Sequence, residues 1–394
     1  MRWACFALLA LLLVACAERE DDGPPAPAAV ATAETRRALW VLAEGSHRAL
    51  QNAARIDQLV DIAARSGFTD LFVQVYRRGR SWFPSTHADD SPYRALKAAS
   101  GISPLQRLLE RAHARDLRVH AWFNALSLAQ NDGAPLLQSV GTDAVHVDRQ
   151  GRSMLDYPEN DVPPPDRRYL RLGTPGVWLD PAVPGVIEYL EQTVDDLVQA
   201  APGLDGLHLD YIRHPLVLPI VPGSRFDLGL DFGYSAQSRE RFERERETRF
   251  RRGDAWDHFR RDQVSETVRR LGERLPEGCE LSAAVLPWAE RAYLVAMQDW
   301  RRWLEEGWVD FVVAMAYTRD DRLLRYLVHG LRGGVGGERV WMGLGSWLFM
   351  RSSERIQVQI DLAQSVAPPG IVLFSYDALI AAPEILEGLR WTSE

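Results

Sequence analysis

The sequence predicts a (β/α)8 barrel, a closed ring of eight parallel strands surrounded by helices. From residue 38 onward, eight short apolar runs alternate with longer helical patterns, which is typical of a parallel sheet. The composition shows no second regime along the 394 residues, so one large domain is expected. A doubly wound open sheet is the alternative fold, but no Gly-rich phosphate loop follows the first run.

The expected strands share an apolar core flanked by polar or Gly/Pro-containing sequence. They lie at 38–44, 70–76, 118–125, 206–211, 280–288, 310–318, 339–347 and 370–377. Helical patterns between them include 51–66, 103–116, 183–200 and 236–275. Irregular stretches at about 128–175 and 216–235 follow the third and fourth strands and predict long insertions in these two βα loops. The charged run at 240–252 predicts a solvated helix.

The N-terminus predicts a lipoprotein signal. Arg2 precedes an apolar run at 6–14 that is too short to span a membrane as a helix. The run ends in Leu13-Val14-Ala15-Cys16, which resembles the lipobox of bacterial lipoproteins and implies removal of residues 1–15 and lipidation of Cys16. Ala17 follows instead of aspartate, which favours the outer membrane, facing the periplasm. A conventional signal with an incidental cysteine is the alternative.

The mature chain is expected to consist of a tether and one domain. Residues 16–37 are acidic and then Pro/Ala-rich, which predicts a disordered tether. The acyl chains on Cys16 would hold the domain at 38–394 on a membrane without a spanning segment. Cys279 is expected to be a buried small hydrophobe, and a monomer is expected.

Composition excludes several classes of function. The net charge of −8 argues against nucleic acid as a partner, because such proteins carry a basic face. The nine histidines form no pair at metal-ligand spacing, so no metal or other cofactor is expected. The stretch at 343–347, "GLGSW", lacks the last glycine of a nucleophile elbow. Thirteen tryptophans suit sugar binding, although core packing explains most of them.

Polar and aromatic residues gather at the C-terminal ends of the expected strands, where barrel enzymes hold their active sites. In order they are Glu44, Gln74, Tyr76, Trp122, Asn124, His208, Asp210, Arg213, Trp288, Tyr317, Asp320, Trp347 and Asp377. The N-terminal ends show no comparable set. This mixture suits a sugar site, in which the residues expected to hold the rings are Tyr76, Trp122, Asn124, Trp288, Tyr317 and Trp347.

The two-residue period of a strand predicts which side chains face the barrel interior. Those expected inside are Gln74, Tyr76, His120, Trp122, Asn124, His208 and Asp210. Those expected against the helices are Leu71, Val73, Val75, Val119, Ala121, Phe123, Leu207 and Leu209. Asp210 would therefore point at the barrel mouth, with His208 one layer beneath it.

Asp210 is the first catalytic candidate, because a glycosidase needs carboxylates across the scissile bond. It lies in the stretch 203–215, "GLDGLHLDYIRHP". The alternative is a structural aspartate that caps the loop or pairs with Arg213. Arg213 itself could lower the pKa of Asp210 and keep it ionised, bind a substrate carboxylate, or brace the loop.

This stretch is similar to the family 18 chitinase signature but departs from it at two positions. His208 stands at the middle aspartate of that signature, and Ile212 stands at its catalytic glutamate. A substrate-assisted chitinase mechanism through this motif is therefore not expected.

Six ordered blocks resemble the glycosyl hydrolase-like 10 family of bacterial secreted proteins and lipoproteins. They lie at 72–85, 111–125, 178–190, 206–215, 259–271 and 300–318, and the resemblance covers nearly all of 37–380. It implies a (β/α)8 barrel, Asp210 as the acid of the fourth strand, and Asn124 and Tyr317 in the cleft. Asp180, in a Leu-Asp-Pro motif, is expected to cap the helix that begins near Pro184.

One departure concerns the loop after the second strand, where family members often carry an arginine at the position of Tyr76 and an aspartate near Arg80. The resulting hypothesis is a glycoside hydrolase of the bacterial envelope, acting on a polysaccharide, most directly peptidoglycan glycan strands. Asp210 would be the nucleophile or base, and Asp377 is the preferred second carboxylate over Glu44 and Asp320. The alternatives are a non-catalytic glycan-binding lipoprotein and a hydrolase of an α-glucan or exopolysaccharide.

Overall fold

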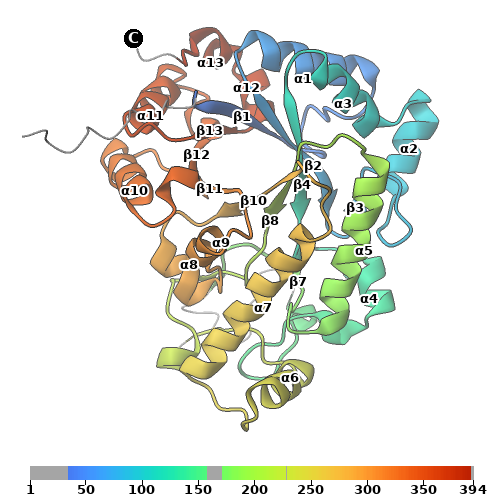
Figure 1. Ribbon diagram of the computed structural model, residues 1–394, viewed down its shortest axis with the longest axis vertical. Helices are drawn as coiled ribbons and strands as arrows, with labels where there is room; N and C mark the ends of the chain where they lie inside the picture. Colours follow the sequence, from blue (N-terminus) through green and yellow to red (C-terminus); the bar gives the residue numbers. More distant parts are fainter. Residues whose placement is uncertain (1–33, 158–170, 228, 392–394) are drawn as a thin grey trace, which may run out of the picture. The chain divides into compact units, whose positions relative to one another are not determined.

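Eight parallel strands close into a barrel in the computed structural model, which describes residues 34–157, 171–227 and 229–391 (Figure 1). The barrel strands are β1 (Arg36–Val41), β2 (Asp70–Arg77), β4 (Arg118–Asn124), β8 (Gly206–Asp210), β10 (Glu280–Val285), β11 (Phe311–Met315), β12 (Val340–Gly345) and β13 (Gly370–Phe374). Each strand pairs with the next, and β1 pairs with both β13 and β2, which closes the ring. The predicted barrel is confirmed.

Helices surround the strands (Figure 1). The longer ones are α1 (Ala53–Arg65), α2 (Ser91–Ser100), α3 (Pro104–His113), α5 (Pro184–Ala200), α6 (Ala236–Arg246), α7 (Asp254–Gly272), α10 (Asp321–Gly333) and α11 (Glu354–Gln364). The shorter ones are α4 (Pro135–Ser139), α8 (Ala289–Val295), α9 (Trp300–Glu305), α12 (Tyr376–Ala381) and α13 (Pro383–Gly388). Local sequence sets their starts: Asn52 accepts a hydrogen bond from the Arg55 N–H, and a proline opens α3 and α5.

Two long insertions follow β4 and β8, as predicted. In the first, β5 (Ser127–Ala129) pairs with β7 (Val177–Trp178). The two insertions also meet each other, because β6 (Arg171–Leu172) pairs with β9 (Val217–Leu218). The prediction that Asp180 caps α5 is wrong. Its carboxylate accepts hydrogen bonds from the Ala182 N–H at 3.0 Å and the Ser238 hydroxyl at 2.7 Å, so it joins the turn before α5 to α6.

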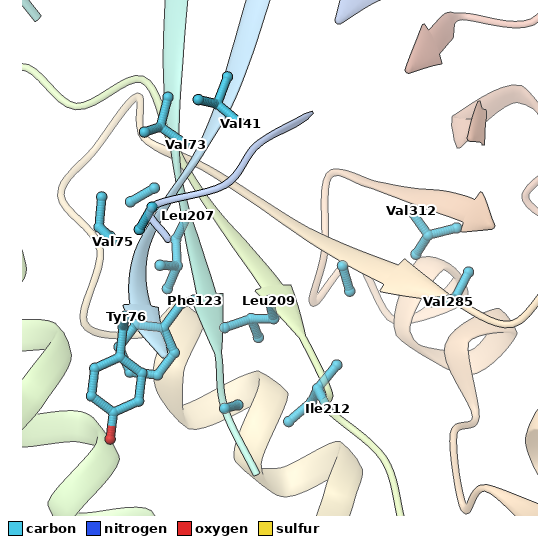
Figure 2. Packing of buried hydrophobic residues seen from close by; sticks show 14 of the residues in the cluster. Val41, Val73, Val75, Tyr76, Phe123, Leu207, Leu209, Ile212, Val285 and Val312 are labelled. Atoms are coloured by element: carbon cyan, nitrogen blue, oxygen red, sulfur yellow. The ribbon is translucent and has the colours of Figure 1, made fainter. Parts of the chain in front are cut away.

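The core has two layers, one on each side of the barrel wall. The outer layer lies between strands and helices and includes Val73, Val75, Leu207 and Leu209 (Figure 2). The inner layer fills the barrel with Ala38, Trp40, Phe72, Trp122, Ala284, Phe311, Val313, Trp341 and Val372. The predicted alternation is confirmed along β4 and β8, whose outward residues belong to the outer layer.

The alternation fails at the end of β2. Gln74 is opposite Trp122 on β4 but Tyr76 is opposite Phe123, so Val75 is an extra residue in a β-bulge. The bulge turns Tyr76 outward, where its ring stacks on Phe123 with 4.1 Å between centroids (Figure 2). The prediction that Tyr76 faces the interior is therefore wrong.

A buried charge network closes the N-terminal end of the barrel, where no polar set was expected. Asp70 and His120 are both fully buried, and 3.0 Å separates Asp70 Oδ1 from His120 Nε2. Arg36 pairs with Asp70 and with Glu280, and its guanidinium lies over the Trp341 ring at 4.7 Å. Burial raises the pKa of Asp70, but His120 and Arg36 outweigh it and hold this pKa well below its usual range.

Cys279, which was expected to be buried, is only half-buried. Burial raises the pKa of its thiol to about 11. Within the described ranges, no helix has the length and apolar character needed to cross a membrane. The signal, Cys16 and the tether up to residue 33 lie outside the described residues.

Asp70→Asn should destabilise the protein by about 3 kcal/mol at pH 7, because it removes the fully buried carboxylate that contacts both Arg36 and His120 and leaves Arg36 with Glu280 alone among the described carboxylates. The depressed pKa means that Asp70 contributes stability above its ordinary pKa, and this contribution is lost as the pH falls. The gap between wild type and variant should therefore narrow below about pH 4 in urea titrations. Asp57→Asn, at the more exposed Arg107 pair, is the control and should cost much less. Equal losses of unfolding free energy in Asp70→Asn and Asp57→Asn would contradict the stabilising role of the Asp70 charge network.

Candidate active site

A cavity of about 290 Å³ opens at the C-terminal end of the barrel. We call it the mouth cavity, and it is lined by Trp40, Leu42, Gln74, Arg77, Trp122, Asn124, Asp210, Tyr211, Ala284, Met315, Tyr317, Trp347 and Phe374. Each of the eight barrel strands, or the residues directly after it, contributes to this wall. This is the end at which (β/α)8 enzymes place their active sites.

Asp210 is the last residue of β8 and carries the one carboxylate among the described residues that line the mouth cavity. Its side chain is almost enclosed, with 8% of the residue exposed. The indole Nε1 of Trp122 donates to Oδ2 at 3.1 Å, and the backbone N–H of Tyr211 donates to Oδ1 at 2.7 Å. Two neighbouring elements therefore hold the carboxyl group in one orientation.

Burial raises the pKa of Asp210 above its ordinary value. The Tyr211 N–H, the charge of Arg213 and the Trp122 indole all lower it, but together they do not offset the loss of water. Arg213 lowers the pKa of Asp210, as the first of its three possible roles stated, but too little to reverse the net upward shift. Compared with an exposed aspartate, the site shifts Asp210 toward its protonated form.

Tyr211 holds an unusual backbone conformation directly after Asp210. Its φ of 53° lies in the left-handed region, which a tyrosine rarely adopts. In this conformation its N–H reaches the carboxylate of the preceding residue, and its side chain lines the mouth cavity. The sequence carries no signal for such a turn at a tyrosine, so this residue was missed.

Two predicted site residues support the cavity from outside its wall. Arg213 is buried, its guanidinium lies over the rings of Trp178 and Tyr211 at 4.9 and 5.4 Å, and it donates to the His214 carbonyl. Among its three possible roles, bracing the loop is the one these contacts show. His208 is fully buried below Asp210 and stacks on Phe72 at 4.5 Å. Burial lowers its pKa, so the ring is neutral.

Asp377 is not at a strand end. Strand β13 stops at Phe374, and Asp377 lies in the first turn of α12. Its Oδ1 accepts hydrogen bonds from the Ser46 hydroxyl at 2.9 Å and the His47 N–H at 2.7 Å. The structure does not bring it into the wall of the mouth cavity with Asp210.

The two other candidate carboxylates are also engaged elsewhere. Glu44 pairs with Arg77 and Arg80 at 3.1 and 3.3 Å. Asp320 is exposed and caps α10 through the N–H groups of Arg322 and Leu323. Neither lines the mouth cavity.

Among the predicted sugar-holding residues, the structure brings Trp122, Asn124, Tyr317 and Trp347 together with Asp210 in the wall of the mouth cavity. It leaves out Tyr76, which faces the helices, and Trp288, which precedes α8 and lies under Arg291. The missed lining residues are Trp40, Leu42, Arg77, Tyr211, Ala284, Met315 and Phe374. The two-residue period along β1 is a signal that could have placed Trp40 inside the barrel. The position of Arg77 depends on the bulge in β2, for which the sequence carries no such signal. In the described ranges, no cluster of three His, Cys, Asp or Glu side chains could hold a metal ion.

The sequence matches a known family over most of its length. Residues 32–322 match the family described as Glycosyl hydrolase-like 10. The chain belongs to this family. The resemblance inferred from the six sequence blocks is therefore confirmed.

Curated relatives are similar to this chain over most of its length. Glycosyl hydrolase DigH of Escherichia coli (strain K12) is 25% identical over 444 aligned residues, covering 96% of this chain and 93% of the relative. Glycosyl hydrolase YngK of Bacillus subtilis (strain 168) is 23% identical over 280 residues, covering 66% and 48%. The catalytic domain of β-amylase from Paenibacillus polymyxa shares the fold, with a TM-score of 0.56, 9% identity, and coverage of 88% and 94%. The protein is a glycosidase, and its substrate is a glycan.

Proposed function

We propose that the protein hydrolyses the glycan strands of peptidoglycan, with Asp210 as the general acid. One observation carries the catalytic part: the carboxyl group of Asp210 is buried at the end of β8 in a cavity lined by aromatic rings. A glycosidic oxygen must receive a proton as its bond to the sugar breaks. A carboxyl group with a raised pKa keeps that proton closer to neutral pH.

The two N–H donors on Asp210 also suit an acid after it has given up its proton. Transfer leaves a carboxylate, and the Trp122 indole and the Tyr211 N–H already point at its two oxygens. Hydrogen bonds to an ionised acceptor are stronger than those to a neutral one, so both contacts strengthen as the proton leaves. This supports an acid, where the sequence led us to expect a nucleophile or base.

The rest of the cavity wall supports sugar binding. Trp40, Trp122, Tyr317 and Phe374 contribute aromatic surface to the cavity wall, against which sugar C–H groups can pack. The Gln74 amide donates to Asn124 Oδ1 at 3.4 Å, and Gln74 Oε1 is buried without a hydrogen-bond partner among the described residues. A sugar hydroxyl would satisfy this acceptor.

Peptidoglycan is proposed as the substrate because of the compartment. The Leu-Val-Ala-Cys sequence at 13–16 supports lipidation of Cys16, which would hold the domain at the outer membrane, facing the periplasm. Glycan strands are the polymer nearest to such an anchor.

Asp210→Asn should lower the rate of reducing-end release from peptide-free glycan strands by at least about 100-fold, because the amide cannot donate the carboxyl proton. Its melting temperature should not fall, since the substitution removes a buried ionisable group whose charged form is disfavoured. Asp320→Asn, at an exposed helix cap, is the matched control and should keep its activity. Normal turnover by Asp210→Asn would contradict the assignment. Saturable binding with no cleavage across a panel that includes α-glucans would identify a non-catalytic binding protein instead.

The pH dependence of kcat/KM tests the acid role separately. The protonated form of Asp210 is active, so the rate should fall as the pH rises through a pKa above the ordinary value for aspartate, about 3.9. The folded protein keeps this proton to a higher pH than the unfolded chain, so stability should also decline across the same interval. A rate that instead rises with pH through that pKa would assign Asp210 the role of nucleophile or base.

Cys16→Ser tests the proposed anchor. Without the thiol no thioether-linked lipid can form, so the protein should move from the membrane fraction to the soluble periplasmic fraction. The measurement is cell fractionation followed by immunoblotting. Cys279→Ser is the matched control and should not change the distribution. A membrane-bound Cys16→Ser protein would contradict lipidation at this residue.

A further inference from the structure

Arg77 is the one cationic side chain among the described residues that line the mouth cavity. It ends β2, one residue after the outward-facing Tyr76, so the bulge in β2 places it at the cavity wall. Arg78 and Gly79 follow with positive φ angles of 58° and 71°, and form a tight turn into β3 (Arg80–Ser81). In this hairpin Arg77 and Arg80 are directly opposite each other.

The two opposed arginines share one carboxylate. Glu44 pairs with Arg77 through Oε2 at 3.1 Å and with Arg80 through Oε1 at 3.3 Å. Arg80 has a second acidic partner, Asp89, at 3.4 Å. Within the described residues, Glu44 is the carboxylate that pairs with Arg77. Glu44 and Asp89 thus balance Arg77 and Arg80, and the third arginine of the turn, Arg78, adds one further positive charge that acts on Arg77.

The pKa of Arg77 reflects this further charge. Burial and the neighbouring charge of Arg78 lower its pKa, and Glu44 does not fully offset them. Such a guanidinium gains from an added anion. The hydrogen bond from Arg77 to Glu44 uses a single Nη1, so most of the five N–H donors of the guanidinium remain for a ligand.

We propose that Arg77 binds a carboxylate carried by the sugar, so that the mouth cavity selects an acidic glycan. This inference rests on the proposed function. In peptidoglycan the group would be the lactyl ether carboxylate of muramic acid, and a uronic acid would present the same chemistry from another polymer. A planar guanidinium can bind a carboxylate through two parallel N–H···O bonds, which gives direction as well as strength.

The structure favours Arg77 over the other two arginines nearby. Arg213 is enclosed by Trp178, Tyr211 and the His214 carbonyl, and does not line the cavity. Arg80 is held by two carboxylates and also lies outside the lining. Arg77 thus combines a position in the cavity wall with N–H donors that Glu44 does not occupy.

Arg77→Gln should change the selectivity of the enzyme. On peptide-free glycan strands, which carry the free lactyl carboxylate, kcat/KM should fall roughly 10- to 100-fold, the value of a charged hydrogen bond. On chito-oligosaccharides, which carry no carboxylate, it should fall less than about threefold. Arg77→Lys keeps the charge without the paired donors and should lie between wild type and Arg77→Gln on the acidic substrate.

Arg80→Gln is the matched control. It breaks the pair with the same Glu44 in the same hairpin, but from outside the cavity, so the ratio of the two kcat/KM values should stay at the wild-type level. Equal losses on both substrates in Arg77→Gln, or the same loss of selectivity in Arg80→Gln, would overturn the proposal, because either result means that Arg77 acts only through the loop.

A binding measurement separates this inference from the proposed function. Calorimetry on Asp210→Asn, with and without Arg77→Gln, would compare a muramic-acid-containing tetrasaccharide, chitotetraose and a uronic-acid oligosaccharide. If the wild type cleaves neither peptide-free glycan strands nor chito-oligosaccharides, the proposed function fails. An Arg77-dependent preference for an acidic ligand in the binding measurement would still support the inference. Equal affinities for acidic and neutral ligands overturn it. A stronger Arg77-dependent preference for the uronate assigns the carboxylate to a uronic acid and excludes the lactyl source.

Discussion

The interior of the barrel has to be filled, and this constraint determines where Asp210 lies. Phe72 and His208 stack at 4.5 Å, and Phe311 and Trp341 stack at 4.1 Å in the same interior. These large rings fit because glycines leave room for them. A Cβ on Gly370 would lie 2.1 Å from the Trp341 ring. Because side chains fill the lower layers of the barrel, Asp210, the next inward residue of β8 after His208, lies at the mouth.

The same packing sets the chemistry of the site. Removing water from around Asp210 costs free energy when the group is charged, and the nearby N–H donors and Arg213 only partly offset that cost. At the other end of the barrel, the equally buried Asp70 is ionised because Arg36 and His120 contact it directly. One fold thus shifts the pKa values of two buried aspartates in opposite directions, according to the charges that contact each of them. The site at the mouth is maintained at a cost in stability, as is common for catalytic groups.

One extra residue in β2 has two consequences at the mouth. The bulge at Val75 turns Tyr76 into the outer core, where its ring stacks on Phe123, and it moves Arg77 to the cavity wall. The tight turn that follows then brings Arg80 opposite Arg77, so that Glu44 forms an ion pair with each of them. The charge that faces the substrate is therefore a product of backbone geometry in the sheet.

The sequence by itself determined the number of strands, the two long insertions, the family and the inward direction of Trp122, Asn124 and Asp210. These follow from periodicity and from local blocks, which need no knowledge of distant contacts. Only the tertiary structure decided the ends of β10 and β13, which place Trp288 and Asp377 outside the cavity. It also decided the bulge, the strained turn at Tyr211 and the raised pKa of Asp210. Each of these depends on how neighbouring strands and buried charges meet across the barrel, and residues far apart in the chain supply those contacts.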